Sequence, residues 1–140
     1  MKGDDIAGRL VQLAVKVIRV VDALPDTATG KHVAGQLLRA GTSPGANYEE
    51  ARGAESRRDF IHKLGIALKE LQETYYWLRV AARANLVDSD LGDVITEVSE
   101  LSYSGQVARD SPSQSGREMA GPTFVMPGSQ FFILDYEGYQ

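Results

Sequence analysis

The two histidines are the residues of this chain best suited to bind a metal. Asp59 and His62 are three residues apart, which places both on one side of a helix and matches half of the paired ligands of di-iron bundles. A complete site needs a second such pair and further carboxylates. The other histidine, His32, has Thr29 three residues before it in place of an acid. The pattern therefore predicts an exposed polar face, with no metal site and no cofactor.

Paired carboxylates are the second arrangement that could do chemistry. Glu70 and Glu73 can share one helix face, and two carboxylates in different surroundings can divide the roles of general acid and general base. Lys69 and Arg79 are close in sequence, so solvated or interface charge is the simpler interpretation. The chain has no cysteine, and no fingerprint of a hydrolase nucleophile, a phosphate-binding loop or a dinucleotide site. We expect no catalytic residue and no enzyme.

Four cations form the candidate site for phosphate: Arg52, Arg57, Arg58 and Lys63. Repetition of this group around an oligomer could hold a nucleic-acid backbone even on an acidic protein. The formal net charge of −4 argues against that use. An ordinary solvated corner is the simpler interpretation, so nucleic acid is a disfavoured partner.

Three consecutive aromatic residues, Tyr75, Tyr76 and Trp77, cannot all face one core, because neighbouring positions on a helix point in different directions. At least one of the three rings must lie on a second surface. Aromatic side chains are enriched where subunits meet. We therefore predict a subunit interface here.

Four amphipathic stretches must position these groups: residues 5–23, 27–53, 56–85 and 88–109. Each repeats apolar residues at the spacing of one helix face. Short connections between such helices favour an antiparallel up-down four-helix bundle, so the predicted fold class is all-α.

Particular residues indicate where these helices begin, end or break. Asp26 or Thr27 is predicted to cap the second helix. Pro44 predicts a kink in it, or a restart with Ser43 as the cap. Asn85 is a predicted left-handed stop for the third helix. Asp88 or Ser89 is the predicted cap of the fourth.

The last 31 residues differ in kind from the rest. Residues 1–109 contain 14 bases and 15 acids, whereas residues 110–140 contain one base and four acids. Serine, proline and glycine predict a linker, followed by an apolar and aromatic run of strand-like composition. We predict a bundle over residues 1–109 and an extended, non-helical tail over 110–140. The residues predicted to bind a partner in the tail are Phe131, Phe132, Ile133, Leu134, Tyr136 and Tyr139.

The sequence also bears on localisation. No apolar run approaches the length of roughly 18–20 residues that spans a bilayer. The start, Met-Lys-Gly-Asp-Asp, has acids where a signal peptide has bases. We expect a cytoplasmic protein with no membrane contact.

Three stretches together resemble a known family: residues 42–51 (Thr-Ser-Pro-Gly-Ala-Asn-Tyr-Glu-Glu-Ala), residues 59–64 (Asp-Phe-Ile-His-Lys-Leu), and residues 66–79 with their Tyr-Trp-Leu-Arg end. The chain resembles, over about residues 5–108, the bacterial four-helix bundle proteins of intervening sequences in large-subunit ribosomal RNA genes. It is similar to the accessory variability protein of diversity-generating retroelements. The resemblance implies a ring, typically a homopentamer, without enzymatic activity. The retroelement members are basic, bind nucleic acid and partner a reverse transcriptase, whereas this chain is acidic.

Three functions remain open at this point. The first is a non-catalytic homo-oligomeric scaffold that binds a partner and presents the tail as a docking peptide, which could add as a strand to the partner's sheet. The second is a precursor of a ribosomally synthesised modified peptide, in which a partner enzyme recognises the bundle and modifies the tail. The third is a nucleic-acid-binding accessory protein of a reverse transcriptase.

Overall fold

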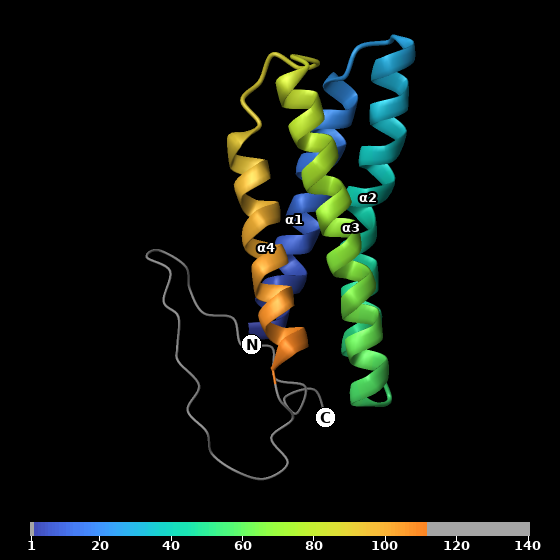
Figure 1. The fold of residues 1–140 in the computed structure, drawn as a ribbon, viewed down its shortest axis with the longest axis vertical. Helices are drawn as coiled ribbons and strands as arrows, with labels where there is room; N and C mark the ends of the chain where they lie inside the picture. The colour runs from blue at the N-terminus through green and yellow to red at the C-terminus, as the bar shows by residue number, and fades with distance from the viewer. Residues whose placement is uncertain (1, 112–140) are drawn as a thin grey trace.

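The computed structural model describes residues 2–111, which form four helices: α1 (Lys2–Ala23), α2 (Ala28–Arg52), α3 (Arg57–Arg83) and α4 (Gly92–Asp110). Figure 1 shows them lying side by side, with each helix running opposite to the one before it. The described residues contain no strand. The predicted antiparallel four-helix bundle is therefore confirmed. The predicted tail and its six partner-binding residues lie outside the described residues.

Side-chain caps begin the two middle helices. The hydroxyl of Thr27 accepts a hydrogen bond from the backbone nitrogen of Gly30 at 3.0 Å. In the same way, the Ser56 hydroxyl accepts one from Asp59 at 3.1 Å. Each bond satisfies a backbone donor that the first helical turn leaves free. Asp26 or Thr27 was predicted as the cap of α2, and Thr27 is the one that caps it.

Pro44 does not interrupt α2, which is helical from Ala28 to Arg52. The predicted restart with Ser43 as a cap is therefore wrong. The side-chain nitrogen of Asn47 donates to the Ser43 carbonyl at 3.0 Å and to its hydroxyl at 2.9 Å, an arrangement inside a helix and not at its start. The Pro44 ring is fully buried, so its packing offsets the backbone hydrogen bond that a proline cannot donate.

The connection between α3 and α4 differs from its prediction at one end. Asn85 has a φ of 53°, which confirms the left-handed stop. The fourth helix, however, starts at Gly92, so neither Asp88 nor Ser89 caps it. Leu91 precedes the helix, is 4% exposed and packs in the core. Leu91 has φ −94° and ψ 3°, and no side chain caps the helix from this position. Asp90 Oδ1 accepts a hydrogen bond from the Gly92 nitrogen at 2.8 Å.

The core runs along the bundle axis and takes side chains from all four helices. The largest fully buried side chains include Leu13, Val17, Leu37, Tyr48, Phe60, Leu78 and Val98. Among neighbouring helices, contact is most extensive between α2 and α3, and least extensive between α1 and α4. The bundle therefore has one thin seam, between its first and last helices.

Gly41 lets α2 approach α1 closely. A Cβ atom at Gly41 would lie 2.6 Å from Val17 Cγ1, and one at Gly45 would lie 3.5 Å from Leu10 Cβ. The first distance is shorter than any ordinary carbon contact. Gly41 is therefore required for this helix spacing. In the antiparallel register of the two helices, it lies opposite Val17.

Candidate functional site

The histidines do not form a metal site within residues 2–111. Both His32 and His62 are exposed, and no group of three histidine, cysteine, aspartate or glutamate side chains in that range is placed to hold an ion. His32 instead packs its ring edge against Trp77, with centroids 5.6 Å apart at 73°. The geometry matches an exposed polar face.

The paired carboxylates of α3 both bind Arg39 of α2. Arg39 Nη1 lies 2.9 Å from Glu70 Oε2, and Nη2 donates to Glu73. The hydrogen bond to Glu73 is the main cause of a raised pKa for Arg39. The sequence placed Lys69 and Arg79 near these acids, but spacing along one helix could not identify a partner on another. The pair joins α2 to α3 at the surface.

Three of the four cations predicted to bind phosphate have partners in the protein. Arg52 binds Asp4 of α1 and lies 3.4 Å from Glu49, and Lys63 lies 2.8 Å from Glu50. The Arg52 guanidinium lowers the pKa of Asp4, first through the hydrogen bond and then through its charge. The other two cations, Arg57 and Arg58, differ from each other in their contacts.

Arg57 donates a hydrogen bond to the carbonyl of Ser111 at the end of α4. Arg58 is exposed, and no acid within residues 2–111 forms an ion pair with it. Within residues 2–111, Arg58 is therefore the member of the four that has neither an ion pair nor a hydrogen bond to the backbone of another helix.

The three consecutive aromatic rings divide between core and surface. Tyr75 and Trp77 are half-buried against the core, whereas Tyr76 is 58% exposed. The rings of Tyr76 and Trp77 meet edge to face, with centroids 5.0 Å apart at 80°. Arg79 lies 5.2 Å from the centre of the Tyr75 ring. Only Tyr76 is thus presented to a second surface.

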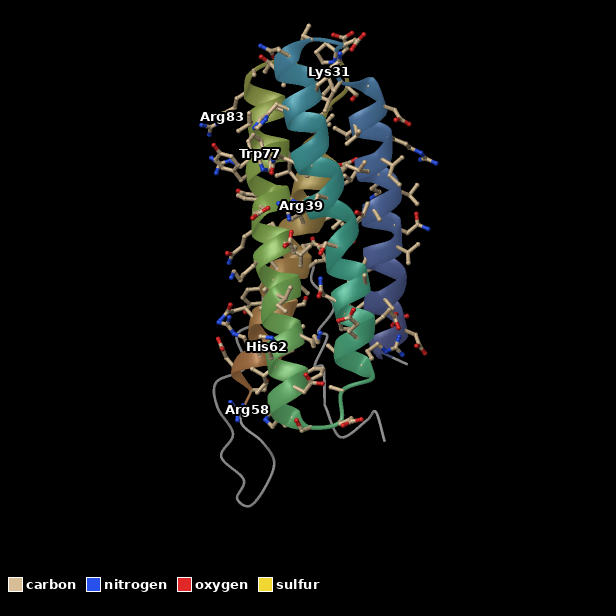
Figure 2. All side chains as sticks on the ribbon, turned by 90° about the vertical axis from the view of Figure 1, so that its right-hand side faces the viewer. Lys31, Arg39, Arg58, His62, Trp77 and Arg83 are labelled. Atoms are coloured by element: carbon tan, nitrogen blue, oxygen red, sulfur yellow. The ribbon has the colours of Figure 1, made fainter. Side chains whose placement is uncertain are left out.

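A row of exposed residues runs along α3 and was not predicted from the sequence; four of its members are permanent cations. The row, which we term the α3 stripe, consists of Arg58, His62, Lys69, Gln72, Tyr76, Arg79 and Arg83. These positions recur at intervals that keep them on one helix face, over about 37 Å at 1.5 Å per residue. Figure 2 shows Arg58 and Arg83 near opposite ends of α3.

The four permanent cations of the α3 stripe form no ion pair with any residue from 2 to 111. The spacing was visible in the sequence. The absence of acidic partners was not visible in the sequence, because it depends on which acids of the neighbouring helices are already bound elsewhere.

A second missed surface lies on the outer side of α1 and α2. Val11 is 60% exposed, Ile18 42% and Leu38 41%. The register set by Val17 and Gly41 brings Leu38 level with Ile18, on the side away from the core. Thr42 and Ala46 continue this side of α2, and both are exposed. We term these residues, with Val15, the α1/α2 face.

A small apolar cavity of about 20 Å³ lies in the core, large enough for about one water molecule. Its lining includes Leu10, Leu68, Leu101 and Gly105, and no charged side chain. A polar substrate would find no charged partner there. None of the described helices is both long and apolar enough to cross a membrane.

Comparison with known proteins identifies the family. The sequence model described as 23S rRNA-intervening sequence protein matches residues 5–104. The chain belongs to this family. It is similar to a crystal structure of a protein of unknown function from the S23 ribosomal protein family of Bacteroides thetaiotaomicron VPI-5482, with 35% identity and a TM-score of 0.66. The similarity covers 74% of this chain and 93% of that chain. No curated protein matches.

The match to the 23S rRNA-intervening sequence protein family includes both newly described surfaces. Residues 11–46 of the α1/α2 face and residues 58–83 of the α3 stripe fall inside the matched range, and residues 112–140 fall outside it. The resemblance noted in the sequence is thereby confirmed. The structural relative is itself described as having no known function.

Proposed function

We propose that this member of the 23S rRNA-intervening sequence protein family is a non-catalytic, self-associating scaffold that binds a partner. The α1/α2 face is the surface through which copies meet. The single observation that carries the proposal is the exposure of branched aliphatic side chains on this face with no charged residue among them.

The exposed aliphatic residues of the face come from two helices held in a fixed register. Val11 and Ile18 are seven residues apart on α1, and the register places Leu38 of α2 level with Ile18. Burial of such side chains contributes roughly 25 cal/mol per Å² of apolar surface removed from water. Monomeric proteins spread exposed apolar residues more singly than this.

Charged groups lie at the two ends of the face. At one end Arg52 binds Asp4, and at the other Lys31 lies 3.1 Å from Asp26. An apolar centre with a polar rim is the usual composition of a protein interface. A second copy of the chain is therefore the occupant that this face fits.

The charge distribution supports a binding role over catalysis. The carboxylates that could have divided acid and base roles, Glu70 and Glu73, are both bound by Arg39. The small cavity offers no charged group. If the α1/α2 face of one copy meets a different surface of the next, this head-to-tail contact would close into a ring, and the family resemblance implies five subunits. The tail, which follows Ser111, would be repeated on every subunit and so presented to a partner several times.

Sedimentation velocity of the full chain at micromolar concentration tests the proposal. We expect an oligomer for the natural sequence, and dissociation for Ile18→Lys and Leu38→Lys, because each places a charge at the centre of the apolar face. Val107→Lys is the matched control, since Val107 is an exposed valine of α4 at 39% exposure. A natural chain that sediments as a monomer would overturn the proposal, and so would equal dissociation by all three variants.

A further inference from the structure

We propose that the α3 stripe is a docking site for the chain's own C-terminal segment, residues 131–140, with Asp135 and Glu137 bound by Arg79 and Arg83. This goes beyond self-association, because the α3 stripe and the α1/α2 face are on different helices.

The first argument is the set of unpaired cations. Arg9, Arg39, Arg52 and Lys63 each have a glutamate or aspartate partner on a neighbouring helix. The cations of the α3 stripe have none within residues 2–111, although they are on a protein with more acids than bases. The nearest acids of α3, Glu70 and Glu73, are already bound by Arg39. The stripe therefore favours an occupant that brings its own negative charge.

The second argument is the chemistry of the segment. Residues 131–140 read Phe-Phe-Ile-Leu-Asp-Tyr-Glu-Gly-Tyr-Gln, with two acids and no base. The stripe carries the exposed ring of Tyr76 between Lys69 and Arg79. Aromatic rings pack edge to face or offset against one another, and guanidinium groups stack on them. An acidic, aromatic peptide thus complements both the charge and the aromatic ring of the stripe.

The third argument is spacing. Arg79 and Arg83 are one helical turn apart, about 6 Å along the axis. In an extended chain, residues i and i+2 are on one side and about 6.6 Å apart. Asp135 and Glu137 have this i, i+2 relation. Each carboxylate can therefore meet one guanidinium, and such charge-assisted hydrogen bonds are the stronger kind.

The fourth argument is reach. Ser111, the last described residue, accepts a hydrogen bond from Arg57, which directly precedes the first residue of the stripe. Asp135 comes 24 residues after Ser111, a maximum span of roughly 80 Å at about 3.3 Å per residue. The stripe is about 37 Å long, so the segment can reach its far end. Tethering gives an effective concentration on the order of millimolar, so a weak intrinsic affinity is enough for occupancy.

A spin label can test the docking in the full chain, because the absence of cysteine allows a single label at Ser129→Cys. In a perdeuterated, ¹⁵N-labelled sample, we expect the label to broaden backbone amides of α3 from Gln72 to Arg83 and to leave those of α1 sharp. Dilution with unlabelled natural chain should not reduce the broadening, because the docking is within one chain. The broadening should fall at high salt, since exposed charge pairs are screened.

Charge-reversal variants provide the decisive test. Reversal of the tail (Asp135→Lys with Glu137→Lys) should abolish the broadening, as should reversal of the stripe (Arg79→Glu with Arg83→Glu). The two reversals combined should restore it, which a structural defect could not do. The matched control, Lys16→Glu with Arg19→Glu, changes two exposed cations of α1 and should leave the broadening unchanged.

Three outcomes would overturn the proposal. One is no broadening on α3, and another is broadening that survives either reversal. The third concerns a phosphate backbone, which the same cations could attract. If a twenty-nucleotide oligothymidine shifts the stripe amides of a chain that shows no label broadening there, the stripe is a nucleic-acid surface and the segment does not occupy it.

Discussion

Arg9 of α1 binds Glu97 of α4 through two hydrogen bonds, from Nε at 2.9 Å and from Nη2 at 2.8 Å. The same Nη2 donates to Glu100 at 2.8 Å. These helices share the thin seam of the bundle, where two neighbouring helices approach each other least extensively. The charge cluster thus joins the first and last helices across that seam.

The first prediction is that protonation of Glu97 in acid lowers the free energy of unfolding. The hydrogen bond from Arg9 is the main cause that lowers the pKa of Glu97. Because the folded-state pKa is below that of an unfolded glutamate, about 4.3, the contribution is complete above that pH and is lost as the pH falls through the lowered pKa. We expect Glu97→Gln to reduce the free energy of unfolding by about 1–2 kcal/mol at pH 7 and by much less at pH 3.

Urea unfolding at both pH values measures this difference. Glu100→Gln is the control, because Glu100 binds the same guanidinium but its side chain is 50% exposed. Its effect at pH 7 should be smaller, below about 1 kcal/mol. An equal loss for Glu97→Gln at the two pH values would mean that its charge does not stabilise the seam.

The second prediction concerns the approach of α2 to α1. Gly41→Ala should lower the free energy of unfolding by about 1–3 kcal/mol, because its Cβ would overlap the branched, stiff side chain of Val17. Gly8→Ala and Gly35→Ala are matched controls, since a Cβ at either position meets nothing within 4 Å. Both should stabilise their helices by roughly 0.5–1 kcal/mol. Thermal unfolding in which all three variants shift the same way would contradict this account of Gly41.

The third prediction is that Gly105→Ala costs less than Gly41→Ala. A Cβ at Gly105 would also lie 2.6 Å from a side-chain atom, here Leu68 Cδ2. Leu68, however, lines the apolar cavity and can move its methyl group into that space. We expect a loss below about 1 kcal/mol by urea unfolding. A loss as large as that of Gly41→Ala would mean that Leu68 cannot relax into the cavity.

The helices could be predicted from the sequence because their signals are local. Apolar spacing located all four, and the cap Thr27 and the stop Asn85 act within a few residues. The start of α4 could not be predicted in this way, and neither could the absence of a restart at Ser43 in α2. Leu91 and Pro44 owe their positions to burial against other helices, which no local rule contains.

The surfaces were harder to predict than the helices, for the same physical reason. Arg39 bridges to Glu70 and Glu73 across 31 and 34 positions of sequence, so the pairing depends on how α2 lies against α3. Because Arg39 binds both glutamates, neither of them pairs with a cation of the α3 stripe. Val11 and Ile18 lie in a stretch with many apolar residues. Their exposure could not be predicted, because in sequence they resemble the core residues around them.

The fourth prediction concerns the turn after α3. Asn85 has a φ of 53°, and the Leu86 nitrogen donates to the Ala81 carbonyl at 3.0 Å, which closes the helix end around that left-handed residue. Asn85→Ala should cost about 1 kcal/mol of unfolding free energy, because a Cβ without a compensating polar group disfavours this conformation. Asn85→Gly should be neutral or slightly stabilising, since glycine adopts positive φ without strain. Urea unfolding of both variants measures the contrast. If alanine were tolerated as well as glycine, the left-handed geometry would not be what ends α3.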